Sequence, residues 1–161
     1  MLNKNNRRNR PVPATRLTKL LLALPLAWLP AIGWALDYRV IAVEQAILYD
    51  APSSKAKKLF IVGRDYPVEV VVNLGDWIKV RDSGGDLAWV EAANLAERRE
   101  VQVMVAQADV LESANGAARP VFRADKNLLL DLLEAGPDGW VKVRHRDGLS
   151  GYIQSSKVWG L

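Results

Sequence analysis

The sequence contains no cysteine and a single histidine, His145, among its 161 residues. The absence of cysteine excludes a disulfide framework, a thiolate metal site, a cysteine nucleophile and a lipid-modified cysteine after the N-terminal segment. A lone histidine between Arg144 and Arg146, with no nucleophile or carboxylate cluster beside it, is typical of an exposed turn residue. We therefore predict no metal and no cofactor.

Motifs for catalysis are lacking as well. The chain has no nucleophile motif, no Gly-rich phosphate loop and no dinucleotide fingerprint. A pair of carboxylates for glycan cleavage would have to come from Asp50, Asp76, Asp82 or Asp86. All four lie in stretches that resemble turns, where Asp is common for backbone reasons. We therefore predict a protein that is not an enzyme and has no catalytic residues.

The chain also lacks a positive surplus outside its N-terminal segment. The formal net charge is +4, but the first 35 residues hold six cations and no acid. The remaining residues carry 16 cations against 18 acids. Nucleic-acid-binding domains normally display clustered Lys and Arg on the folded surface, so we predict no nucleic-acid partner.

Residues 1–35 have the three parts of a secretory signal peptide. A cationic start is followed by the uncharged run LLLALPLAWLPAIGWAL, and the small residues Gly33 and Ala35 mark a cleavage site. The alternative is an uncleaved anchor, because this run of 17 residues approaches the roughly 20 that span a bilayer. Pro25 and Pro30 interrupt the run and favour cleavage. We expect an exported protein, periplasmic or in the cell envelope, with no membrane contact after leader cleavage.

A repeat spaced by 63 residues organises the rest of the chain. DWIKVRD at 76–82 matches GWVKVRH at 139–145, and the same spacing places Leu48 on Leu111 and Tyr49 on Glu112. Only the segment VEVVV, which resembles LLDLL, needs a spacing of 62. Two copies of about 60 residues predict two small tandem domains, at 38–96 and 99–161.

Each copy has the pattern of short β-strands. Val68, Val70 and Val72 alternate on one face of a predicted strand, and Ile78 and Val80 on one face of the next. Glycine-containing turns separate such segments at short intervals, which is typical of a small barrel. Short helical turns are expected only at 92–95 and 155–157. The predicted fold class is all-β, with two tandem small β-barrels.

The order of these motifs resembles the bacterial SH3-like domain. Its elements are the turn L-x-x-x-P-S at 48–53, the acidic strand at 68–70, W-x-K-V-R at 77–81, a Gly-rich hairpin, then W-V at 89–90 and a terminal Leu. The resemblance implies five- or six-stranded SH3-like barrels that act as exported or envelope-associated binding modules. The second copy departs more, with Asn115 at the position matched to Pro52.

Aromatic residues supply the candidate ligand-binding side chains. Trp77 and Trp89 have the opposite strand parity to the core residues Ile78 and Val90, so we expect them to face outward near Tyr49. Such a surface can hold a sugar ring or a peptide, or can instead cover the barrel end or meet the other copy. Trp140 and Tyr152 are the matched candidates in the second copy.

Two further features accompany these candidates. Trp159 has no counterpart in the first copy, and we predict that it packs in the last strand or between the copies. Lys55, Lys57, Lys58 and Arg64 form a local basic run. It is either a site for an acidic partner or anionic lipid head groups, or a solvated loop, and its position in a loop favours the latter.

The sequence therefore predicts an exported, non-catalytic SH3-like binding module of the cell envelope. Its predicted partner is a peptidoglycan fragment or one of its peptides. The alternatives are an adaptor that binds an envelope protein in the periplasm, and a membrane-anchored sensor domain. The sequence leaves open the oligomeric state and whether both copies bind.

Overall fold

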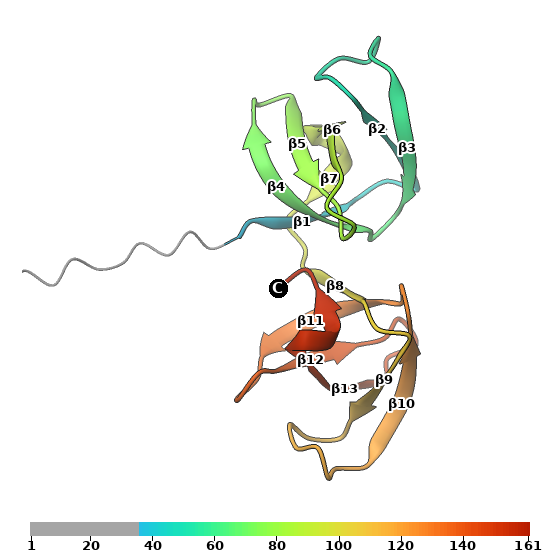
Figure 1. The fold of residues 1–161 in the computed structure, drawn as a ribbon, viewed down its shortest axis with the longest axis vertical. Coiled ribbons are helices and arrows are strands. Elements are labelled where there is room, and N and C mark those ends of the chain that lie inside the picture. Colours follow the sequence, from blue (N-terminus) through green and yellow to red (C-terminus); the bar gives the residue numbers. More distant parts are fainter. Residues whose placement is uncertain (1–35) are drawn as a thin grey trace, which may run out of the picture. The chain divides into compact units, whose positions relative to one another are not determined.

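The alternating segments form β-strands throughout the part of the chain that this computed structural model describes, residues 36–161 (Figure 1). The predicted all-β class is confirmed. Short 3-10 turns at Ala92–Asn94 and Ser155–Lys157 confirm the two expected helical turns. The signal peptide predicted at 1–35 lies outside the described residues. No helix within the described range is long and apolar enough to cross a membrane.

The first sheet contains seven antiparallel strands in the order β3-β2-β6-β5-β4-β1-β7. Figure 1 shows the strands wrapping around a common interior, while the strand order ends at β3 on one side and at β7 on the other. The strands are β1 (Tyr38–Ile41), β2 (Gln45–Tyr49), β3 (Lys58–Gly63), β4 (Pro67–Asn73), β5 (Trp77–Arg81), β6 (Leu87–Glu91) and β7 (Leu95–Ala96).

The second sheet repeats this arrangement with the order β10-β9-β13-β12-β11-β8-β14. Each strand holds the place of its counterpart in the first sheet, so the predicted duplication is confirmed at the level of topology. That 38–96 and 99–161 are separate domains stays a prediction. The strands are β8 (Glu100–Val103), β9 (Gln107–Leu111), β10 (Pro120–Asp125), β11 (Leu129–Ala135), β12 (Trp140–Arg144), β13 (Ser150–Gln154) and β14 (Val158–Trp159).

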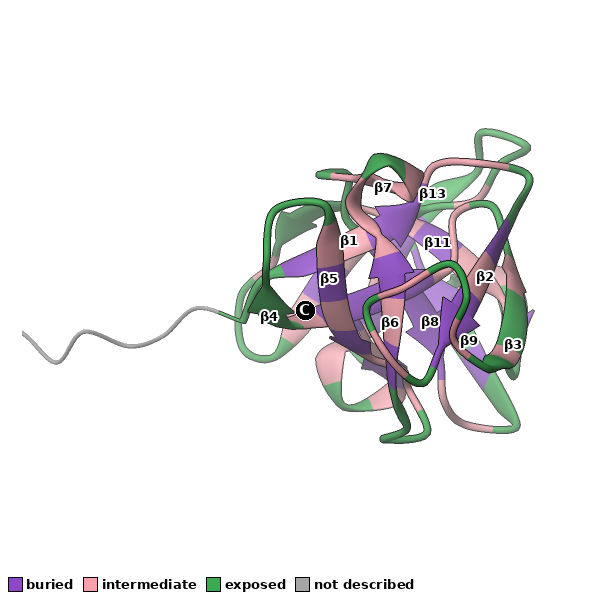
Figure 2. Ribbon diagram, turned by 90° about the horizontal axis from the view of Figure 1, so that it is seen from above, coloured by how far each residue is buried: buried purple, intermediate pink, exposed green. Residues whose placement is uncertain are grey.

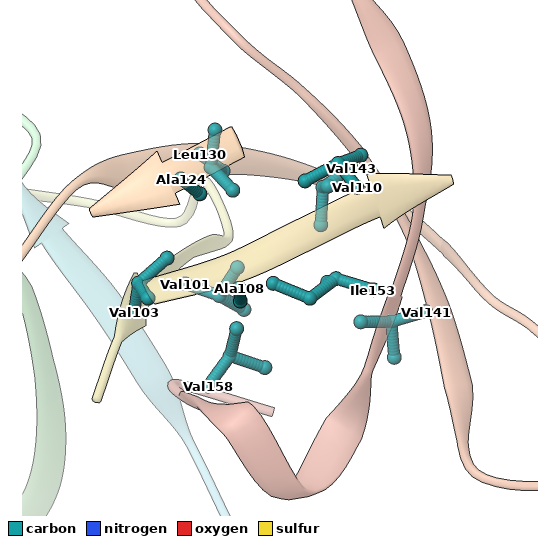
Figure 3. Close-up of a cluster of buried hydrophobic side chains, with 10 residues drawn as sticks. All are labelled: Val101, Val103, Ala108, Val110, Ala124, Leu130, Val141, Val143, Ile153 and Val158. Carbon is teal, nitrogen blue, oxygen red and sulfur yellow. The ribbon is translucent and has the colours of Figure 1, made fainter. Parts of the chain in front are cut away.

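Each sheet encloses its own core of aliphatic side chains. In β5 and β6 the buried residues Ile78, Val80 and Val90 alternate with partly exposed ones, as predicted, and Figure 2 shows this alternation along the strands. The second core is drawn in Figure 3, where Leu130, Ile153 and eight other side chains converge between the strands. Burying one such Val, Leu or Ile side chain stabilises the fold by about 1.5–3 kcal/mol.

A β-bulge in β4 corrects one predicted face. Val68 is fully buried, whereas Val72 is 38% exposed and does not share the core face with it. The register against β5 shifts between Val70, which pairs with Val80, and Val72, which pairs with Lys79. The extra residue reverses the side-chain alternation after Val70. The same bulge occurs in β11 between Leu132 and Glu134.

The structural spacing of the two copies also differs from the predicted one. Strands β1 to β4 are related to β8 to β11 by 62 residues, and β5 and β6 to β12 and β13 by 63. The additional residue lies in the loop 136–139, which is matched to the shorter loop 74–76. Tyr49 therefore corresponds to Leu111 and not to Glu112. The pairings agree, because Tyr49 lies opposite Trp89 and Leu111 lies opposite Tyr152.

Trp159 packs where the sequence predicts, because it contacts a residue of the other copy. Its ring centroid is 5.1 Å from that of Tyr38 on β1, with the two planes at 87°. The guanidinium of Arg99 lies 5.9 Å from the centre of the same Tyr38 ring. Aromatic pairs in this edge-to-face geometry contribute about 0.5–1.5 kcal/mol beyond their buried area.

Glu100 at the start of β8 is a buried carboxylic acid, only 5% exposed. Burial, together with the nearby carboxylates of Asp65 and Asp131, raises its pKa from the ordinary 4.5 to about 7. Arg98 opposes this shift, because its Nη2 lies 3.6 Å from Glu100 Oε1; it also pairs with Asp65. The folded protein therefore binds a proton at Glu100 more tightly than the unfolded chain does.

We predict that Glu100→Gln raises stability at alkaline pH. The stabilisation from protonated Glu100 is complete below about pH 4.5 and is lost as the pH rises through about 7. The variant should therefore melt higher than the wild type at pH 8, by on the order of 2–8 °C, with the difference shrinking toward pH 5. Thermal melts at both pH values test this, and an equal difference at the two would contradict it.

Candidate functional site

The outward faces of β5 and β6 bring three candidate side chains together. Trp77 and Lys79 on β5 and Trp89 on β6 are partly exposed, while the residues between them point into the core. Lys79 pairs directly with Trp89 across the two strands, and its Nζ lies 5.8 Å from the centre of the Trp89 ring. We call Trp77, Lys79 and Trp89 the outer aromatic surface. Its outward orientation confirms the predicted strand parity.

Tyr49, at the end of β2, belongs to the same side of the sheet but is buried. Only 7% of the residue is exposed, so the ring does not form the floor of an exposed site as expected. Its centroid lies 5.5 Å from that of Trp77, with the planes at 82°. Tyr49 also pairs with Trp89 in the sheet. Tyr49 therefore supports the indole of Trp77 through an edge-to-face contact.

The loop that follows Tyr49 is held by Asp50. The backbone N–H of Asp50 donates to the carbonyl of Lys57, and the backbone N–H of Lys57 donates to the Asp50 carboxylate at 3.0 Å. Within the loop, Ser53 Oγ accepts a hydrogen bond from the N–H of Lys55. These bonds fix the direction in which the chain leaves Tyr49. The predicted turn at 48–53 is thereby observed, and its aspartate has a structural role.

A cleft of about 370 Å³ adjoins Trp77. Asp76 and Glu91 line it together with Ser54 and the alanines at 92 and 93. Trp77 and Glu91 are paired across β5 and β6, which places a carboxylate beside the indole. The indole offers an apolar face for packing, and the carboxylates and the hydroxyl can accept hydrogen bonds from hydroxyl or ammonium groups.

The second sheet repeats only part of this site. Lys142 Nζ lies 5.8 Å from the ring centre of Tyr152, which reproduces the Lys79–Trp89 contact. Trp140 is partly exposed on β12, but Leu111 stands where Tyr49 supports Trp77. Trp140 lines a different cleft of about 530 Å³, whose other lining residues include Leu132, Leu133 and Val141. The five predicted aromatic candidates thus fall into two unequal groups, one on each sheet.

Glu91 and Lys79 were not among the predicted site residues, and Asp76 was considered only as a catalytic carboxylate and interpreted as a turn residue. Asp76 and Glu91 look like ordinary turn and strand-end residues in the sequence, and no motif marks them. Lys79 could have been found, because the pattern W-x-K recurs in both copies at 77–79 and 140–142. A lysine two residues from a tryptophan on one strand face can reach an aromatic ring on the neighbouring strand.

His145 is less exposed than the sequence predicts. Its side chain is only 21% exposed, its Nδ1 lies 2.9 Å from the Asp147 carboxylate, and its ring centroid is 5.8 Å from that of Phe122. The hydrogen bond from Leu149 N–H and the contact with His145 lower the pKa of Asp147. Within residues 36–161, no group of three or more His, Asp or Glu side chains is placed to hold a metal ion. The predicted lack of catalysis stays a prediction.

These features define the class to which the protein belongs, an all-β chain with two copies of a small SH3-like sheet. Residues 42–97 and 133–160 match the family described as "Bacterial SH3 domain". The first range spans β2 to β7, and the second runs from β11 to the end of β14. Together they cover slightly more than half of the chain, which therefore belongs to the bacterial SH3 domain family. The resemblance inferred from the sequence motifs is confirmed.

Three solved structures show a distant likeness. NlpC2 from Trichomonas vaginalis is 15% identical with a TM-score of 0.37, over 78% of this chain and 48% of that one. NlpC1 from the same organism is 17% identical with a TM-score of 0.36, over 77% of this chain and 45% of that one. An NlpC/P60 family protein from Bacillus cereus ATCC 10987 is 16% identical with a TM-score of 0.35, over 76% of this chain and 55% of that one. The chain thus spans about half the length of each, and no curated protein matches it.

We predict that Tyr49→Phe keeps the stability of the protein and that Tyr49→Leu lowers it. Tyr49→Phe retains the edge-to-face contact with Trp77. Tyr49→Leu introduces the residue that the second sheet has at this position, and so removes the aromatic contact. The leucine variant should lose about 1 kcal/mol of unfolding free energy, measured by denaturant titration. Its tryptophan emission should also change, because Trp77 loses its support. Equal losses in the two variants would show that the aromatic contact is not the cause.

Proposed function

We propose that the first sheet binds peptidoglycan fragments through the outer aromatic surface and the cleft beside Trp77. The observation that carries this proposal is an indole that is supported by Tyr49 and flanked by Asp76 and Glu91. An indole immobilised in this way can pack against a ligand without a large loss of side-chain entropy on binding. Membership of the bacterial SH3 domain family supports a binding role.

The chemistry of the cleft suits a ligand that is both ring-shaped and polar. A pyranose ring presents C–H groups that pack on an indole face and hydroxyl groups that donate to carboxylates. A peptide stem adds ammonium groups, and the carboxylates of Asp76 and Glu91 can also accept hydrogen bonds from these. Lys79 next to Trp89 offers a cation for an acidic group of the same ligand. Peptidoglycan fragments combine these features in one molecule.

The setting of this activity belongs to the same proposal. The leader at 1–35 supports export to the periplasm or the cell envelope, where such a ligand is found. The protein acts as a non-catalytic module, without a cofactor and without nucleic acid. A periplasmic adaptor that binds an envelope protein, and an anchored sensor domain, are the competing functions.

We predict that the purified protein co-sediments with isolated cell-wall sacculi in a saturable manner. Trp77→Ala should weaken this binding roughly tenfold, which corresponds to about 1.4 kcal/mol. Trp140→Ala is the matched control, because it removes the equivalent indole of the second sheet and should leave the affinity nearly unchanged. Circular dichroism verifies that both variants are folded.

Three outcomes of the sedimentation experiment would contradict the proposal. The folded protein could stay entirely in the supernatant, which would favour a protein partner. The Trp77 and Trp140 variants could lose the same affinity, which would mean that the first sheet has no special role. Trp77→Ala could bind as well as the wild type, which would place the binding surface elsewhere.

A further inference from the structure

Strand β3 (Lys58–Gly63) ends the strand order of the first sheet. It pairs with β2 on one side, and no strand among the described residues pairs with its other side. We call this side the β3 edge. In Figure 1, β3 lies along the outside of its sheet next to β2, and Figure 2 colours much of it as exposed. Backbone N–H and C=O groups on such an edge can pair with another extended chain.

The equivalent strand of the second sheet is protected against such pairing. Strand β10 begins with Pro120, which has no N–H to donate, where β3 has Lys58. Arg123 on β10 forms an ion pair with Asp109 on β9 at 3.0 Å. Charges and proline on an edge strand are the usual means by which proteins prevent edge-to-edge association.

The β3 edge has neither this proline nor this cross-strand ion pair, and its one charged residue, Lys58, lies at the first position of the strand. Ile61 stands where β10 has Arg123, and its partner across the strands, Ile47, stands where β9 has Asp109. Ile61 is 68% exposed and Phe60 is 45% exposed. Two neighbouring large apolar residues on a strand with an unpaired edge are costly to leave in water, which indicates a surface for a partner.

Charge selects the kind of partner. Lys55, Lys57 and Lys58 are exposed at the start of β3, and none of them forms an ion pair with a described residue. Arg64 follows the other end of the strand and pairs with Glu44 at 2.8 Å. An extended segment with acidic residues beside apolar ones would neutralise the three lysines and cover Phe60 and Ile61.

We propose that the β3 edge binds an acidic, extended segment of a partner protein, which adds to the first sheet as an extra strand. The main-chain hydrogen bonds of strand addition supply affinity without sequence preference, and Ile47, Ile61 and the lysines supply the selectivity. This surface is separate from the cleft beside Trp77, which lies on β5 and β6. It therefore does not rest on the proposed peptidoglycan binding.

A second copy of this chain is the less suitable occupant. Parallel pairing of two β3 strands would place the lysine run of one copy beside that of the other. Antiparallel pairing would place it beside Arg64. Like charges lie close together in both arrangements, which is unfavourable across strands.

The test uses an eight-residue peptide with alternating Glu and Val, acetylated and amidated at its ends. Titrated into the ¹⁵N-labelled protein, it should shift the backbone amide signals of β3, with a dissociation constant of about 0.1–1 mM. A peptide with Lys in place of Glu should bind at least about tenfold more weakly. The Glu-Val peptide methylated on all its backbone nitrogens should not bind, because neither of its edges then has N–H donors for strand pairing.

Protein variants copy the second sheet onto the first. Lys58→Pro and the double variant Ile47→Asp with Ile61→Arg install the residues of β9 and β10, and should abolish the β3 shifts while retaining the circular dichroism spectrum. Replacing Lys55, Lys57 and Lys58 together with Gln changes only exposed side chains. It should weaken binding several-fold and reduce its salt dependence.

Four results would overturn the proposal. The first is that no amide signals of β3 shift at millimolar Glu-Val peptide, and the second is that the Lys peptide binds with equal affinity. The third is that the shifts centre on β10 or on Trp77 and Trp89. The fourth is that the β3 signals shift with protein concentration in the absence of peptide. The last would identify a second copy as the occupant. The peptide titrations contain no sacculi. A negative result for strand addition is therefore distinguishable from a failure of the proposed peptidoglycan binding.

Discussion

The packing of aliphatic side chains inside two small sheets is the interaction on which the rest of this structure depends. A chain without cysteine cannot reinforce cores of this size covalently, so burial has to stabilise them. The largest fully buried side chains are Ile, Leu and Val, with Ile78 and Val80 in the first core and Ile153 in the second. Trp77 and Trp89 lie outside these cores and are partly exposed, whereas Tyr49 is buried against Trp77.

One substitution within the repeat gives the two sheets different surfaces. Tyr49 in the first sheet packs edge-to-face against Trp77, whereas Leu111 occupies its place in the second. The strand edges differ in the same direction, since Ile61 is exposed where Arg123 is bound to Asp109. The first sheet thus carries both of the proposed binding surfaces. The second carries the more protected version of the same topology.

The repeated motif W-x-K-V-R and the glycine-containing turns were sufficient to predict the fold class, the duplication and the outward position of Trp77 and Trp89. The burial of Tyr49 was not predictable, because it depends on a contact between β2 and β5, which are far apart in the chain. Matching Tyr49 to Leu111 required the position of the extra residue in the loop 136–139. Val72 was misplaced because a bulge reverses side-chain alternation without leaving a marked residue pattern.

In the proposed function, the supported indole of Trp77 makes the first sheet the ligand-binding one. The most direct measurement follows the indole N–H signals of the tryptophans in a ¹⁵N–¹H spectrum while a soluble disaccharide-peptide fragment of peptidoglycan is added. We expect saturable shifts of Trp77 and Trp89, with the signals of Trp140 and Trp159 unchanged. Shifts confined to Trp140, or no indole shift in the folded protein at millimolar fragment, would contradict it.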